Sequence, residues 1–136
     1  MTKSRLSIVV SLLMLASVLS SCAASKDEAV AMQAIEEFHV RFNNLAFSSI
    51  YEEAHQNIRV MIPKEAFLES MKAMREGQGA VIKTQKLGVE YSYSTEGKII
   101  KILVQVAFEK GNAKEEFMYY ISENKAYLTS YRFIAP

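Results

Sequence analysis

Several residue types are nearly absent from this 136-residue sequence, and each absence excludes a class of site. Cys22 is the only cysteine, Asp27 is the only aspartate, and there is no tryptophan. A single cysteine leaves no partner for an internal disulfide, and one aspartate excludes calcium or catalytic sites built from several aspartates. The chain also has no glycine-rich phosphate loop and no nucleophile elbow, so we expect no cofactor.

The two histidines, His39 and His55, do not form a metal-binding motif. Two histidines and a glutamate are the right ligand types for zinc, and Glu36 and Glu52 lie near them. However, no H-E-x-x-H motif or closely spaced histidine pair occurs. We therefore interpret both histidines as residues at the rim of a helix or in solvent, and expect no metal.

The first 21 residues have the three parts of an export signal. Lys3 and Arg5 precede an apolar run from Leu6 to Leu19, and small residues follow it. The apolar run is short for a membrane span. Its end, Leu19-Ser20-Ser21-Cys22, resembles the lipobox of bacterial lipoproteins.

The lipobox resemblance implies cleavage between Ser21 and Cys22, with an S-diacylglyceryl and an N-acyl group on Cys22. Two or more acyl chains anchor a protein stably to a membrane. In a Gram-negative host, Ala23 in place of an aspartate favours the outer membrane, facing the periplasm. The membrane is thus the first expected partner and the cell envelope the expected location, while an uncleaved anchor or plain secretion are the alternatives.

The remaining chain is expected to form one domain. We divide it into the signal 1–21, a tether 22–25 that begins with the lipidated cysteine, and a domain 26–136. Removing Lys3 and Arg5 from 16 basic residues leaves 14, against 15 acidic ones, so the mature chain has a formal charge of −1. This balance does not favour nucleic acid as a partner.

The first half of the domain has the periodicity of helices. Ser25-Lys26-Asp27-Glu28 is typical of a capping box before a helix over about 26–44, whose apolar stripe is Ala31, Ile35, Phe38, Phe42 and Leu45. A shorter helix is predicted over 48–59, with Ser49 in a second capping box. A third begins at Pro63 and ends at Gly77 and Gly79.

The second half alternates with the period of strands. The clearest alternation is Ile100, Ile102, Val104, Val106 and Phe108. Further strands are predicted on either side of it, up to Ala126–Ile134, and they are separated by short turns. Helices followed by four strands predict an α+β domain, in which N-terminal helices pack on a curved four-stranded antiparallel sheet.

This order of elements resembles the cystatin-like, or nuclear transport factor two-like, roll, and in particular small exported bacterial domains of that fold. The segments that carry the resemblance are 63–79, 104–108, 116–121 and 128–134. In such a roll the sheet and the long helix enclose a cone, and we expect Tyr91, Tyr119, Tyr131 and Glu116 as candidate pocket-lining residues. Ordinary core packing of the tyrosines, and pairing of Glu116 with Arg132, are the alternatives.

The sequence contains no catalytic constellation, so we expect a non-enzymatic protein. The predicted function is binding or scaffolding at the membrane, with an envelope protein or a small apolar ligand as partner. The alternative is an enzyme of the isomerase or dehydratase type that uses a glutamate and a tyrosine in the cone, because relatives with that chemistry need a carboxylate base and an oxyanion donor in an apolar cavity.

Overall fold

The computed structural model describes Ala24 and residues 26–136. The predicted signal, the lipobox with Cys22, and Ser25 of the first capping box lie outside these residues. Ala24, which precedes the predicted start of the first helix at residue 26, is itself helical. Within the described part of the chain, no helix combines the length and apolar character needed to cross a membrane.

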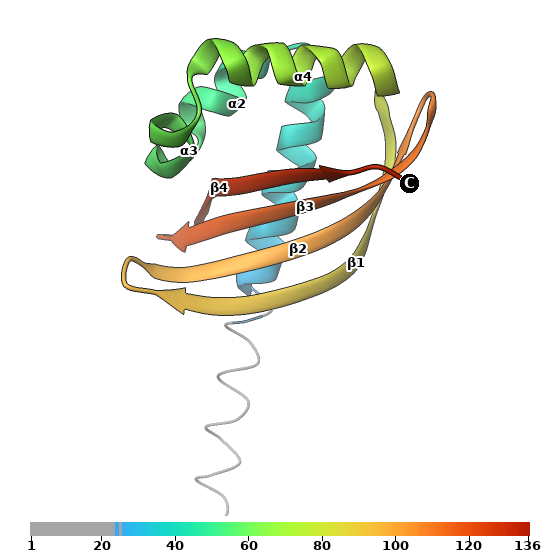
Figure 1. The fold of residues 1–136 in the computed structure, drawn as a ribbon. Coiled ribbons are helices and arrows are strands. Elements are labelled where there is room, and N and C mark those ends of the chain that lie inside the picture. Colours follow the sequence, from blue (N-terminus) through green and yellow to red (C-terminus); the bar gives the residue numbers. More distant parts are fainter. Residues whose placement is uncertain (1–23, 25) are drawn as a thin grey trace, which may run out of the picture.

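The described elements are four helices followed by four strands (Figure 1). The N-terminal helix is described over 26–43 and is followed by α2 (Phe47–Glu53), α3 (Gln56–Met61) and α4 (Lys64–Gln78). The strands are β1 (Val81–Ser94), β2 (Gly97–Phe108), β3 (Gly111–Ser122) and β4 (Lys125–Ile134). They form one antiparallel sheet in the order β1-β2-β3-β4, which confirms the predicted meander and the α+β class.

The core lies between the curved sheet and the N-terminal helix, which crosses one face of the sheet, while α4 lies beside β4 (Figure 1). The predicted alternation of β2 is confirmed. Its five alternating apolar residues, Ile100, Ile102, Val104, Val106 and Phe108, are all buried. They meet the buried stripe of the N-terminal helix, which includes Ile35, Phe38 and Phe42.

The region between the long helix and α4 differs from the prediction. Instead of one helix over 48–59 there are two, because the backbone at Ala54 is extended and His55 starts a new helix, its Nδ1 accepting a hydrogen bond from the Asn57 amide. Ser49 is not a cap, since its hydroxyl donates to the carbonyl of Ala46. The predicted ends of α4 are confirmed at Pro63, which immediately precedes it, and at Gly79, which ends it with a positive φ of 79°. Gly77, also predicted to end the helix, lies inside it.

Candidate functional site

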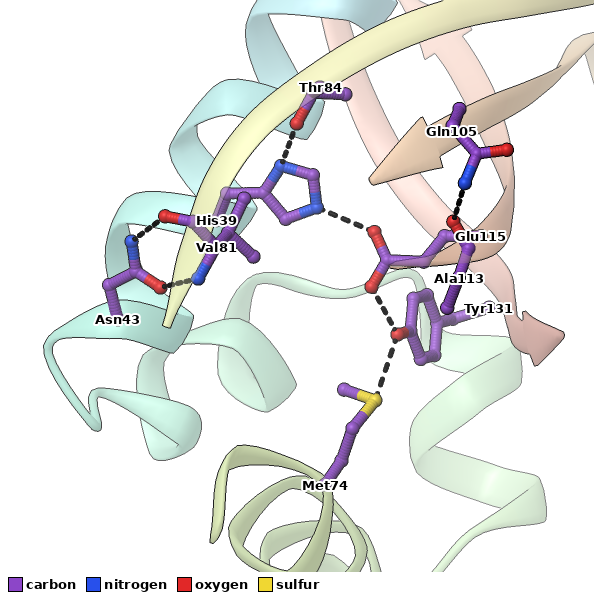
Figure 2. Close-up of polar contacts among 9 residues, drawn as sticks. All are labelled: His39, Asn43, Met74, Val81, Thr84, Gln105, Ala113, Glu115 and Tyr131. Atoms are coloured by element: carbon purple, nitrogen blue, oxygen red, sulfur yellow. Dashed lines mark hydrogen bonds and ion pairs between the residues drawn. The ribbon is translucent and has the colours of Figure 1, made fainter. Parts of the chain in front are cut away.

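A cluster of polar side chains lies inside the cone (Figure 2). The imidazole of His39 on the N-terminal helix has Nε2 2.6 Å from Glu115 Oε2 and Nδ1 3.0 Å from the hydroxyl of Thr84. The other carboxylate oxygen of Glu115 accepts a hydrogen bond from Tyr131 at 2.6 Å. Only 6% of His39 and 1% of Glu115 are exposed. A buried carboxylate is tolerated when its oxygens are hydrogen-bonded, and here each oxygen has a partner.

Tyr131 closes one side of this cluster. Its hydroxyl lies 2.6 Å from Glu115 Oε1 and 3.2 Å from the sulfur of Met74 on α4. Because a hydroxyl has one proton and a carboxylate is the stronger acceptor, the proton is donated to Glu115. Burial, followed by the charge of Glu115, raises the pKa of Tyr131 far above its ordinary value. The hydroxyl therefore stays protonated and remains a donor.

The strand register explains why Glu115, and not Glu116, enters the interior. Ala113, Glu115, Phe117 and Tyr119 alternate on the buried face of β3. Glu116 lies on the opposite face, where its carboxylate accepts a hydrogen bond from Arg132 at 3.1 Å. The prediction that Glu116 lines the cone is therefore wrong, and its alternative, the pair with Arg132, is what the structure contains. The sequence itself could have indicated that Glu115 is buried, because it lies on the same face of the strand as Phe117 and Tyr119, at a spacing of two residues.

The prediction that His39 lies at a rim or in solvent is also wrong. His39 follows Ile35 by four residues and precedes Phe42 by three, so it belongs to the buried stripe of the helix. His55 instead caps α3, and its Nε2 lies 3.8 Å from Glu96. Within the described residues there is no group of three His, Cys, Asp or Glu side chains that could hold a metal.

An open groove lies next to the closed cluster, between α3, α4 and β4. It has a volume of about 650 Å³. Its lining is formed by Ile58, Met61, Ile62, Phe67, Ser70, Met71, Ala73, Met74, Gly77, Gln78, Thr129, Ser130, Tyr131 and Phe133. No charged residue is among them. Met61 is 80% exposed and its neighbour Val60 is 84% exposed, so the rim of the groove presents large apolar side chains to water.

A smaller cavity of about 220 Å³ lies between the N-terminal helix, α2 and the β3–β4 turn. Tyr119 lines it and is only 2% exposed. Its hydroxyl has no hydrogen-bond partner in the described part of the chain. Burial raises the pKa of Tyr119 well above the ordinary value. An ion pair between Arg41 and Glu53, 2.8 Å apart, lies among the lining residues.

The three tyrosines predicted to line one pocket are therefore in three places. Tyr119 lines the small cavity and Tyr131 lines the groove. Tyr91 is 40% exposed, and its hydroxyl donates to the carbonyl of Ala24 at 3.0 Å, at the start of the described helix. Sequence reasoning also missed the groove, because its shape depends on how three short elements pack.

Comparison with known proteins supports the fold. No family model matches the chain, and no curated protein matches its sequence. Among solved structures, Aln2 from a Streptomyces species is similar, with a TM-score of 0.52 and 10% sequence identity over 79% of this chain and 89% of Aln2. This similarity shows the nuclear transport factor two-like roll. The fold has both binding and enzymatic members, so it does not by itself choose between them.

Proposed function

We propose that the protein is a membrane-anchored envelope lipoprotein, held through Cys22, whose roll binds a small apolar ligand without enzymatic turnover. The observation that carries the binding role is the groove between α3, α4 and β4. Pockets for small molecules are typically concave and mainly apolar, with few polar groups, and roughly 300–1,000 Å³ is a usual size. The groove, at about 650 Å³, is within that range.

The lining of the groove supports an apolar ligand. Met61, Met71 and Met74 come from α3 and α4, and flexible methionines adapt to ligands of different shape. Each square ångström of apolar surface removed from water contributes roughly 25 cal/mol. A ligand that covers the exposed Met61 would therefore gain binding free energy by removing this side chain from water.

The same lining argues against catalysis. No carboxylate, imidazole or amine is among the residues that line the groove, and Tyr131 is the one titratable group there. Its hydroxyl is already donated to Glu115. General acid–base catalysis needs a group within hydrogen-bond reach of the substrate with a pKa near the working pH. The raised pKa of Tyr131 does not meet that need.

An isomerase or dehydratase remains the second candidate, and one observation favours it. Tyr131 faces the groove and connects through Glu115 to His39, with two consecutive contacts of 2.6 Å. We propose to test it with 3-cyclohexen-1-one, whose conversion to the conjugated ketone is followed by ultraviolet absorbance. The binding role predicts no acceleration over buffer. Acceleration that is lost in Glu115→Gln would establish the enzyme instead.

The binding role is tested with N-phenyl-1-naphthylamine, a neutral apolar probe that becomes fluorescent in apolar surroundings. Ala73 and Ala66 are both exposed alanines of α4, but only Ala73 lines the groove. We expect saturable binding of the probe to the wild-type protein and to Ala66→Phe. Binding to Ala73→Phe should be at least about tenfold weaker, which corresponds to a loss of about 1.4 kcal/mol of binding free energy. Equal binding by the two variants would contradict the assignment of the groove.

A further inference from the structure

The N-terminal helix and β1 lie side by side and run in opposite directions. Near the C-terminal end of the helix, the Asn43 side chain accepts from the Val81 amide at 2.8 Å. Further back, His39 contacts Thr84 at 3.0 Å, and at the start of the described helix Tyr91 donates to the carbonyl of Ala24. Residues later in β1 therefore contact residues earlier in the helix.

Two ion pairs hold the first turn of the helix on the sheet. Asp27 accepts from Lys98 on β2, and Glu28 accepts from Lys86 on β1. The hydrogen bond to Asp27 raises the pKa of Lys98, which keeps that lysine charged. The start of the helix is therefore fixed relative to the β1–β2 hairpin.

This fixed geometry limits the distance between the hairpin and Cys22. Ala24 follows Cys22 by two positions, and extended chain spans at most about 3.6 Å per residue, or about 7 Å in all. The carbonyl of Ala24 is 3.0 Å from the Tyr91 hydroxyl. The headgroup region on each side of a bilayer is roughly 5–8 Å thick. A lipidated Cys22 would therefore place the Tyr91 hydroxyl at, or just above, the headgroups.

The next residue on this face of β1 is Tyr93, two positions beyond Tyr91. It is 80% exposed, so the protein leaves a large aromatic ring in water at the end where the chain leads to Cys22. Tyrosine is enriched at membrane interfaces, because its ring is apolar and its hydroxyl is polar. We propose that Tyr93 inserts among the lipid headgroups of the membrane that holds the anchor, so that the β1–β2 hairpin is a second membrane contact.

The charges around the hairpin indicate an aromatic contact and not a polybasic one. Lys86, Lys98 and Lys101 are each paired with a carboxylate, the last with Glu90 at 2.5 Å. Glu96 at the hairpin turn adds an exposed negative charge. We therefore expect the contact to be no stronger on anionic than on zwitterionic vesicles.

The contact would also set the orientation of the domain. The described helix over 26–43 rises about 27 Å along its axis. Its far end is bound to Val81, close to the C-terminal end of α4 (Figure 1). The end of the groove that is lined by Gly77 and Gln78 would thus lie on the side of the domain away from the bilayer. This inference rests on the anchor of the proposed function and is independent of what the groove binds.

The absence of tryptophan makes the contact directly measurable. In the mature lipidated protein, Tyr93→Trp introduces a single tryptophan at the hairpin. Ile82→Trp introduces a single tryptophan at the other end of β1, where Ile82 is 68% exposed. The two positions are separated by about 36 Å of extended strand. Both proteins are reconstituted in phosphatidylcholine vesicles, with and without lipids brominated on their acyl chains, and flotation measures attachment to the vesicles.

We expect a blue shift of the Tyr93→Trp emission and roughly a twofold loss of intensity with brominated lipid, because tryptophan at an interface is partly desolvated. Ile82→Trp should show neither change. Flotation without quenching of Tyr93→Trp would overturn the hairpin contact while leaving the anchor intact. Failure of the wild-type protein to float would overturn the anchor and this contact together, and neither result depends on binding in the groove.

Discussion

The interior of the cone and the groove beside it share Tyr131 but are built in opposite ways. In the cone, the polar side chains are buried and hydrogen-bonded to one another, and aromatic rings fill the space. The ring centroid of Phe38 lies 5.1 Å from that of Phe117 and 5.0 Å from that of Tyr131. In the groove, the lining is uncharged and large apolar side chains such as Met61 are exposed. The polar residues of the cone therefore satisfy one another's hydrogen bonds, while apolar residues at the rim of the groove are exposed to water.

The largest predicted effect is the loss of the buried carboxylate. Glu115→Ala leaves the buried imidazole of His39 and the hydroxyl of Tyr131 without their partner, and each such orphaned group costs about 1–3 kcal/mol of unfolding free energy. Glu116→Ala is the matched control, because it removes the neighbouring glutamate from the outer face and should cost about 0–1 kcal/mol. Urea denaturation of both variants measures the difference. Similar losses would show that the interior cluster does not support the fold as described.

A smaller effect is expected for the tyrosine that the two regions share. Tyr131→Phe leaves one oxygen of buried Glu115 without its donor and should cost about 1–3 kcal/mol. Tyr119→Phe makes the same change at a hydroxyl that has no partner in the described chain, so the free energy of unfolding should stay about the same or rise. Thermal melts compare the two directly. A larger loss for Tyr119→Phe would contradict the hydrogen-bond assignment.

The loss of unfolding free energy at alkaline pH should reveal the buried tyrosines. The pKa values of Tyr119 and Tyr131 are raised in the folded protein by burial, whereas tyrosines of the unfolded chain ionise near pH ~10. The contribution of these tyrosines to the free energy of unfolding is therefore complete below about pH 10. As the pH rises above that value, each tyrosine loses about 1.4 kcal/mol of this contribution per pH unit. Urea denaturation between about pH 9 and 11 should show a shallower slope in Tyr119→Phe. An unchanged slope would mean that this hydroxyl is accessible.

Sequence reasoning recovered the regular part of the fold. The alternation of β2 and the glycine that ends α4 were predicted correctly, because both follow from local patterns. The break at Ala54 was missed, since an alanine gives no helix-breaking signal. Glu115 was overlooked and His39 was assigned to a helix rim or solvent, although their spacing placed both on buried faces, because charged and titratable residues are normally assigned to the surface.

The groove could not be predicted in the same way. Val60-Met61-Ile62 is an apolar stretch of the sequence, and apolar residues usually indicate core, but here Val60 and Met61 are exposed. Their exposure depends on how α3 packs beside β4, which is a contact between elements far apart in the chain. Local periodicity contains no information about such a contact.

The most direct test of the central claim is methyl NMR of the methionines, because the chain contains both reporters and controls. Met61, Met71 and Met74 line the groove, while Met32 on the long helix and Met118 on the outer face of β3 do not. With ¹³C-methyl methionine and N-phenyl-1-naphthylamine, we predict shifts of the three groove resonances and none of the other two. Shifts of the Met32 and Met118 resonances, with the three groove resonances unchanged, would contradict binding in the groove.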